Sequence, residues 1–119
     1  MLYSRTMPIT NTELQHLQVG GPSIQINVDV FLPNGTLSNP AGPPALVIES
    51  NNQPGKGTCV VHPTNPRAVI LSPGAAAGGG TVVLNTDPPS NTKLAIPFAT
   101  DPAPDASEIR FVSASPVQP

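Results

Sequence analysis

The residues with the clearest potential for metal chemistry are three acids in the segment Asp101-Pro-Ala-Pro-Asp105-Ala-Ser-Glu108. Carboxylate oxygens are the ligands that Ca²⁺ prefers, and here three carboxylates are close in sequence. The usual calcium loop, which interleaves Asp and Asn with a Gly, is missing. We therefore expect Asp101, Asp105 and Glu108 to be solvated turn residues, keep calcium as the alternative, and expect no cofactor.

Cys59 and His62 have the Cys-x-x-His spacing found among zinc ligands. In a strand, however, residues three apart point to opposite faces of the sheet. His16 is the only other histidine and Cys59 is the only cysteine, so a set of four zinc ligands is hard to assemble. We expect Cys59 to pack as a small hydrophobic residue beside a half-exposed His62.

Other catalytic signatures are incomplete. The Gly-rich run 74–80 lacks the Lys-Ser/Thr of a phosphate-binding loop, and we expect it to be a flexible connection between strands. The nucleophile pattern Gly-x-Ser-x-Gly does not occur, so the sequence predicts that the protein is not an enzyme. Asn34-Gly35-Thr36 matches the N-glycosylation pattern, but Asn-Gly is also a strong hairpin signal, so whether Asn34 carries a glycan stays open.

Charged residues are scarce. Five Lys and Arg against seven Asp and Glu give a net charge of −2, and charged residues make up 10% of the chain, where about 25% is usual. The basic residues are isolated and only four side chains are aromatic, so the features that bind nucleic-acid phosphates and bases are missing. No apolar stretch approaches the roughly 18 residues of a membrane span. We expect neither a nucleic acid nor a membrane as partner.

Proline and glycine leave little room for helices. The chain has 17 Pro and 10 Gly, and a helix interior tolerates these residues at a cost of about 3 and about 1 kcal/mol each. Residues 24–30 instead alternate between apolar and polar types, which predicts a half-buried strand over 23–32. A turn at Pro33-Asn34-Gly35-Thr36 follows. Six further strands are expected over 45–49, 57–62, 67–72, 81–86, 93–98 and 108–114.

Seven short strands separated by turns predict an all-β fold, an Ig-like antiparallel β-sandwich. The pattern resembles the disulfide-free Ig-like sandwiches of bacterial surface proteins and phage virion proteins, because the Cys pair and Trp of antibody domains are absent. A Greek-key barrel or a jelly-roll fragment is the alternative. We divide the chain into an extended N-terminal arm (1–21), a sandwich domain (22–115) and a short C-terminal tail (116–119). Within the arm, Thr10-x-x-Glu13 could cap a short helix, and an additional strand is equally compatible.

The resemblance implies a structural function. It predicts a small capsid decoration or cement protein that stabilises a phage head, located on the virion and binding the major capsid protein or neighbouring copies of itself as an oligomer. The alternative is an Ig-like module of a bacterial extracellular adhesin or pilus, which a chain starting at Met1 without a leader fits less well. A carbohydrate-binding sandwich is disfavoured because sugar sites usually need aromatic platforms.

The expected partner-binding residues lie at the start of the chain. Leu2, Tyr3, Met7 and Ile9 supply apolar side chains on a segment that Pro and Thr interrupt too often for it to build its own core. Burial of these side chains against a partner would contribute binding free energy at about 25 cal/mol per Å². We expect recognition by apolar and backbone contacts, with strand edges as additional docking surfaces.

Overall fold

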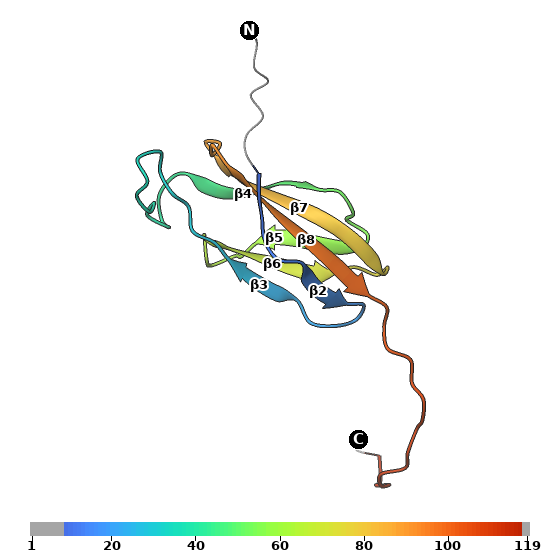
Figure 1. The fold of residues 1–119 in the computed structure, drawn as a ribbon. Coiled ribbons are helices and arrows are strands. Elements are labelled where there is room, and N and C mark those ends of the chain that lie inside the picture. The colour runs from blue at the N-terminus through green and yellow to red at the C-terminus, as the bar shows by residue number, and fades with distance from the viewer. Residues whose placement is uncertain (1–8, 118–119) are drawn as a thin grey trace.

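The structure is a computed structural model and describes residues 9–117. These residues form eight strands in two sheets and contain no helix, so the all-β prediction is confirmed (Figure 1). It follows that no helix within 9–117 is able to cross a membrane.

The larger sheet is built around the last strand of the chain. Strand β8 (Lys93–Asp101) pairs antiparallel with β7 (Gly78–Asp87), which in turn pairs antiparallel with β4 (Ala45–Asn51). The other edge of β8 carries both β1 (Ile9–Asn11) and β2 (Gln15–Gln18), which run parallel to it. The beginning of the described chain is therefore fixed to its last strand.

The smaller sheet has the strand order β3-β6-β5 and is antiparallel throughout. Its strands are β3 (Ile24–Asn27), β6 (Ala68–Pro73) and β5 (Gly57–Val61). After β3 the chain makes the predicted turn, in which Gly35 adopts a φ of +86° and Phe31 bridges Leu37 across the hairpin. This hairpin extends beyond the sheet at one end of the molecule.

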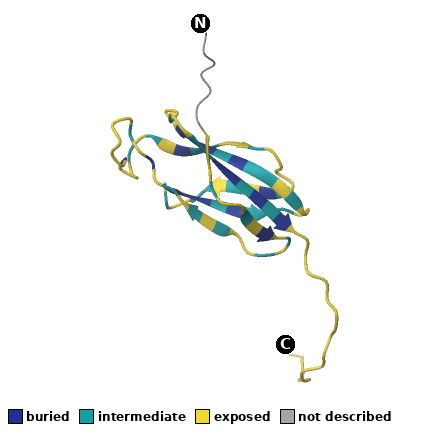
Figure 2. Cartoon of the chain, viewed as in Figure 1, coloured by how far each residue is buried: buried dark blue, intermediate teal, exposed yellow. Residues whose placement is uncertain are grey.

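The core lies between the two sheets. Alternate residues of the central strands point inward, as the period-2 geometry of strands requires. The buried apolar residues of this core are Leu17, Leu46, Val69, Leu71, Val82, Leu84, Ile96 and Phe98. Ile24 and Ile26 pack against them from β3, as the alternation in the sequence predicts, but the strand covers only 24–27 of the expected 23–32 (Figure 2).

At the start of the chain the structure settles an open alternative, and in the middle it corrects an expectation. Of the two alternatives left open for residues 10–18, the strand is the one observed: β1 ends at Asn11 and β2 covers Gln15–Gln18, with Leu17 buried in the core. The Gly-rich run is not a flexible loop throughout, since Gly78–Gly80 begin β7 and pair with β8. A Cβ on Gly80 would lie 2.7 Å from Phe98 Cζ, so the missing side chain makes room for that ring.

The expected strand over 108–114 is also absent. β8 ends at Asp101, and residues 102–117 form no strand and are exposed along their whole length. We call residues 102–117 the tail segment; in Figure 2 it leaves the body as an extended, uniformly exposed chain. With β1 and β2 included and 108–114 excluded, the described residues contain eight strands where seven were expected.

Candidate functional site

The three acids proposed as calcium candidates lie at the end of β8 and beyond it. Asp101 is the last residue of β8, and Asp105 and Glu108 are exposed on the tail segment. Glu108 forms an ion pair with Arg110. Within residues 9–117, no group of three His, Cys, Asp or Glu side chains lies close enough to hold a metal ion.

Cys59 and His62 have separate structural surroundings. Cys59 is half-buried in β5 and packs against the core, and this burial raises the pKa of its thiol from 9.0 to about 11. His62 follows β5, and its Nδ1 accepts hydrogen bonds from the backbone N–H groups of Thr64 (3.1 Å) and Asn65 (3.0 Å). The imidazole thus holds the turn before β6.

Of the four predicted partner-binding residues, Leu2, Tyr3 and Met7 lie outside the described residues. Ile9 begins β1, and its side chain is exposed. Asn34 sits in the hairpin turn, where its Oδ1 accepts hydrogen bonds from the backbone N–H (3.1 Å) and the hydroxyl (2.6 Å) of Thr36.

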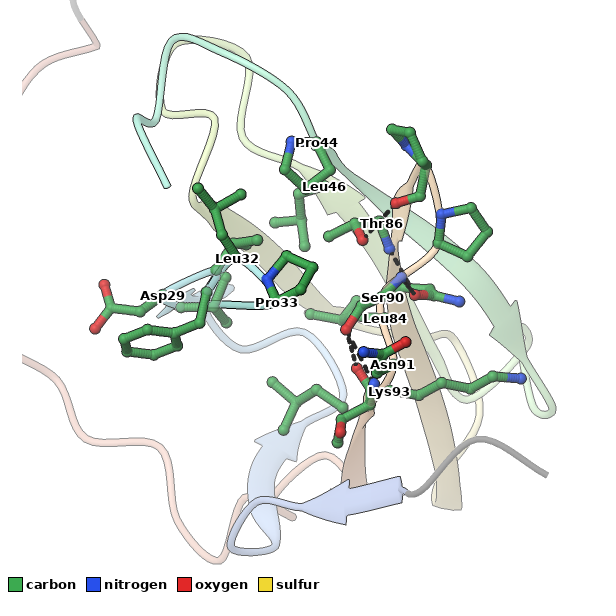
Figure 3. A pocket seen from close by; sticks show the side chains of 18 of the residues that line it. Asp29, Leu32, Pro33, Pro44, Leu46, Leu84, Thr86, Ser90, Asn91 and Lys93 are labelled. Carbon is green, nitrogen blue, oxygen red and sulfur yellow. Dashed lines mark hydrogen bonds between the residues drawn. The ribbon is translucent and has the colours of Figure 1, made fainter. Parts of the chain in front are cut away.

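An open groove of about 770 Å³ lies at one end of the sandwich, and we call it the end groove (Figure 3). One rim is the segment 28–33 that leads into the hairpin, and the other is the connection 88–92 with the start of β8. The buried Leu46 and Leu84 lie between these rims and expose the edge of the core to the groove. Prolines from three segments also line it: Pro33, Pro43, Pro44, Pro88 and Pro89.

The rim that follows β7 is held by its own side chains. Asn85 Oδ1 accepts hydrogen bonds from the backbone N–H groups of Thr86 (2.8 Å) and Ser90 (3.0 Å). The Thr86 hydroxyl donates to the carbonyl of Pro88 (2.8 Å), and the Ser90 hydroxyl donates to that of Thr92 (2.7 Å). Proline rings and these bonds restrict the backbone, so the groove is largely pre-formed.

Few charges face the end groove. Lys93 forms an ion pair of 3.0 Å with Glu49, and the hydrogen bond from Lys93 lowers the pKa of that carboxyl from its usual value. Asp29 lies exposed on the opposite rim, where its side chain points outward from the groove (Figure 3), and it forms no ion pair with any residue in 9–117. The groove thus offers an apolar floor with one uncompensated carboxylate, which suits an apolar segment with a basic residue.

A smaller hollow of about 390 Å³ lies beside it and contains Arg67. The guanidinium is buried and donates hydrogen bonds to Ser38 Oγ (2.9 Å), the carbonyl of Asn39 (3.3 Å) and the carbonyl of Pro66 (3.3 Å). These bonds attach the chain after the hairpin to the smaller sheet. We assign Arg67 a structural role.

The most exposed apolar side chains of the described chain are on the tail segment. Ile109 is 95% exposed and Phe111 is 84% exposed, with Val112 and Val117 similarly open to solvent. The sequence predicts a strand over 108–114, but no feature of the sequence indicates that this segment has no neighbouring strand to pair with. The end groove had no single sequence signal, because its prolines come from turns that only the fold brings together.

Comparisons with protein-family models, curated proteins and solved structures find no match to this chain.

Proposed function

We propose that the protein is a structural component of a larger assembly: a capsid decoration or cement protein that binds the major capsid protein of a phage head. The observation that supports this most is the tail segment, where Ile109, Phe111 and Val112 stand in solvent. Contiguous exposed apolar surface is unfavourable in an isolated soluble protein and is typical of surfaces that a protein partner covers.

The arrangement of strands supports an Ig-like assignment. If β3 to β8 correspond to strands B to G, the sheet β3-β6-β5 matches B, E and D, and β4-β7-β8 matches C, F and G. The two sheets of an Ig-like sandwich divide these strands in the same way. Such a fold carries many functions, so this assignment supports the proposal only by analogy.

The contact with the capsid protein is assigned to the N-terminal arm. Ile9 is exposed on β1 at the edge of the larger sheet, and Leu2, Tyr3 and Met7 precede it in sequence. Because charged residues are scarce, apolar burial supplies the binding free energy, and attachment depends weakly on salt.

The experiment is to purify phage particles from cells that carry the gene and to quantify this chain against the major capsid protein by mass spectrometry. We expect a fixed stoichiometric ratio that survives about 1 M salt, where charges are screened within about 3 Å. Recovery of the chain only from the cell envelope or the medium would contradict the proposal.

A matched pair of variants tests the arm. Leu2→Ser, Tyr3→Ser and Met7→Ser together should prevent the purified protein from rebinding to particles that lack it. Ser4→Ala with Thr6→Ala changes the same segment but keeps its apolar side chains, and should rebind normally. All eight described strands lie outside the substituted residues, so both variants should unfold at the same temperature as wild type.

The second candidate is a module of an extracellular adhesin or pilus. It is favoured by the parallel pairing of β1 and β2 with β8, which places Ile9 and Asp101 at opposite ends of the body, as serial modules require. Detection of the chain on intact cells with an antibody, and its absence from particles, would favour this candidate.

A further inference from the structure

The tail segment and the end groove are both apolar and both uncovered. We propose that they are two halves of one contact, in which residues 108–112 of one copy lie in the end groove of a second copy and join the copies head to tail. The inference rests on the proposed structural function and names the contact between neighbouring copies.

The tail segment has a sequence suited to docking but no site on its own body. Between Pro104 and Pro116 it contains neither Pro nor Gly, and Ile109, Phe111 and Val112 are β-branched or aromatic. Among residues 9–117, one side-chain hydrogen bond joins it to the body, from Gln18 Nε2 to the carbonyl of Pro102, at 3.5 Å. Its apolar side chains therefore remain available to another molecule.

The end groove offers the complementary surface. Its volume of about 770 Å³ falls within the roughly 300–1,000 Å³ of sites that enclose ligands. Leu32, Leu46 and Leu84 line it, and proline-rich segments and the bonded connection after β7 form its rims. Because these rims are already fixed, the conformational entropy cost of docking is confined to the tail segment.

The topology makes a second copy the occupant. Lys93, at the start of β8, lines the groove, and the tail segment begins after Asp101, at the far end of that strand. A strand of this length spans about 27–30 Å at about 3.4 Å per residue. In Figure 1 the tail segment continues away from the groove end of the body, so it meets the groove of a following copy without reversing direction.

Charge supports the same pairing. Arg110 lies between Ile109 and Phe111, and in an extended chain it points to the side opposite these two residues. With Ile109 and Phe111 in the groove, its guanidinium is at the rim, where Asp29 is exposed and forms no ion pair with residues 9–117. Arg110 can therefore exchange its exposed partner Glu108 for Asp29 of the second copy.

A contact between two different surfaces is heterologous. When two copies have bound, one of them keeps an unused groove and the other keeps an unused tail segment. The assembly therefore grows into an open chain or closes into a ring, in contrast to a two-fold dimer, which uses both surfaces at once.

Sedimentation of the full-length purified protein at rising concentration tests the contact. We expect wild type to form a series of oligomers by about 1 mM, the range of weak contacts. Phe111→Asp and Phe31→Asp should each weaken association at least about tenfold, because one removes the aromatic anchor of the tail segment and the other removes an apolar side chain that lines the groove. The matched controls are Ser113→Asp, just beyond the docked residues 108–112, and Val60→Asp, at an exposed position of β5 that does not line the groove.

Mixing the two defective variants is the sharper test. Phe111→Asp retains an intact groove and Phe31→Asp retains an intact tail, so together they should form a 1:1 complex that grows no further. The pair Asp29→Arg and Arg110→Asp should likewise associate only when mixed. The inference is overturned if wild type stays monomeric at all concentrations or if the mixed variants form no complex. It is also overturned if the control variants weaken association as much as Phe111→Asp and Phe31→Asp do.

The experiment uses no particles and therefore separates this inference from the proposed function. A protein that binds phage particles but does not self-associate would refute only the head-to-tail contact. A protein that self-associates through tail and groove but is absent from particles would refute the capsid assignment.

Discussion

Gly57 in β5 faces the ring of Phe98, which is 1% exposed in the core. A Cβ built on Gly57 would lie 2.6 Å from Phe98 Cε2 and 2.9 Å from Cζ. Phe98 is surrounded by other core residues and has no room to move away. The position of the Phe98 ring therefore requires that residue 57, in the opposite sheet, has no side chain.

We expect Gly57→Ala to lower the free energy of unfolding by about 1–3 kcal/mol, the usual cost of overpacking a core. Urea unfolding followed by circular dichroism measures the change. Gly55→Ala is the matched control, because a Cβ there meets nothing within 4 Å. If both variants lose the same stability, the contact with Phe98 is not the cause.

Cys59 is expected to link stability to alkaline pH. Its pKa is raised from 9.0 to about 11 because burial disfavours the thiolate. The folded protein therefore holds this proton more tightly than the unfolded chain does. The associated stability is fully present below pH 9 and is lost as pH rises toward 11.

The measurement compares wild type with Cys59→Ala by urea unfolding across this pH range. The stability of wild type relative to Cys59→Ala should fall as pH rises from 9 toward 11, while Lys and Tyr titrations affect both proteins equally. A difference that stays constant over the range would refute the raised pKa. In parallel, the native thiol should react more slowly with a thiol reagent than the urea-unfolded one.

At the scale of elements, Leu17 is the anchor of β2. It is the one residue of this short strand that is buried, and it joins the core, while Gln15 is half-buried and His16 and Gln18 are exposed. An edge strand with a single buried side chain depends strongly on that side chain. The parallel backbone pairing with β8 then fixes its direction.

We expect Leu17→Ala to reduce the free energy of unfolding by about 2–5 kcal/mol, as for other buried leucines. Leu14→Ala removes the same atoms from an exposed position and should change stability by less than about 0.5 kcal/mol. Hydrogen exchange should show that the amides of β2 lose protection first in Leu17→Ala. Unchanged protection there would mean that backbone pairing alone holds the strand.

How well each strand could be predicted depends on what its pattern encodes. The alternation around Ile24 and Ile26 gives both a strand and its buried face, and Asn34-Gly35 gives the turn, because these signals are local. β2 was ambiguous because Leu14 and Leu17 also fit one helical turn. The segment 108–114 has the composition of a strand, but a strand forms only beside another strand. No local pattern in the sequence shows whether such a neighbouring strand is present.

The end groove could not be predicted from sequence for the same reason. Pro33, Pro43 and Pro88 each mark a turn, and the sequence showed these turns separately. Their convergence depends on the order of strands in both sheets. Asp101, Asp105 and Glu108 are the opposite case. They are close in sequence, but within the described chain they do not form a group of three metal ligands.

At the scale of the whole molecule, the tail segment contributes little to folding. It follows the last strand, its residues are exposed, and one hydrogen bond from Gln18 attaches its start to the body. We expect a variant lacking 104–119 to keep the free energy of unfolding of the full chain within about 0.5 kcal/mol. Calorimetry of dilute protein, where copies do not meet, measures this; a clear fall in the unfolding temperature would show that the tail segment packs on its own body.

The parallel alignment of β1 and β2 with β8 also determines how the body responds to mechanical force. Tension applied from Ile9 and Asp101 pulls these strands past each other along their length, since the two residues lie at opposite ends of the paired region. The hydrogen bonds of the ladder are then loaded together in shear, instead of opening one at a time as in a peeled hairpin. Rupture under such a load is governed by the rate of unfolding. In a row of copies joined head to tail, the tension would enter each body at the groove, beside the start of β8, and leave it after Asp101, so β8 would carry it along its whole length.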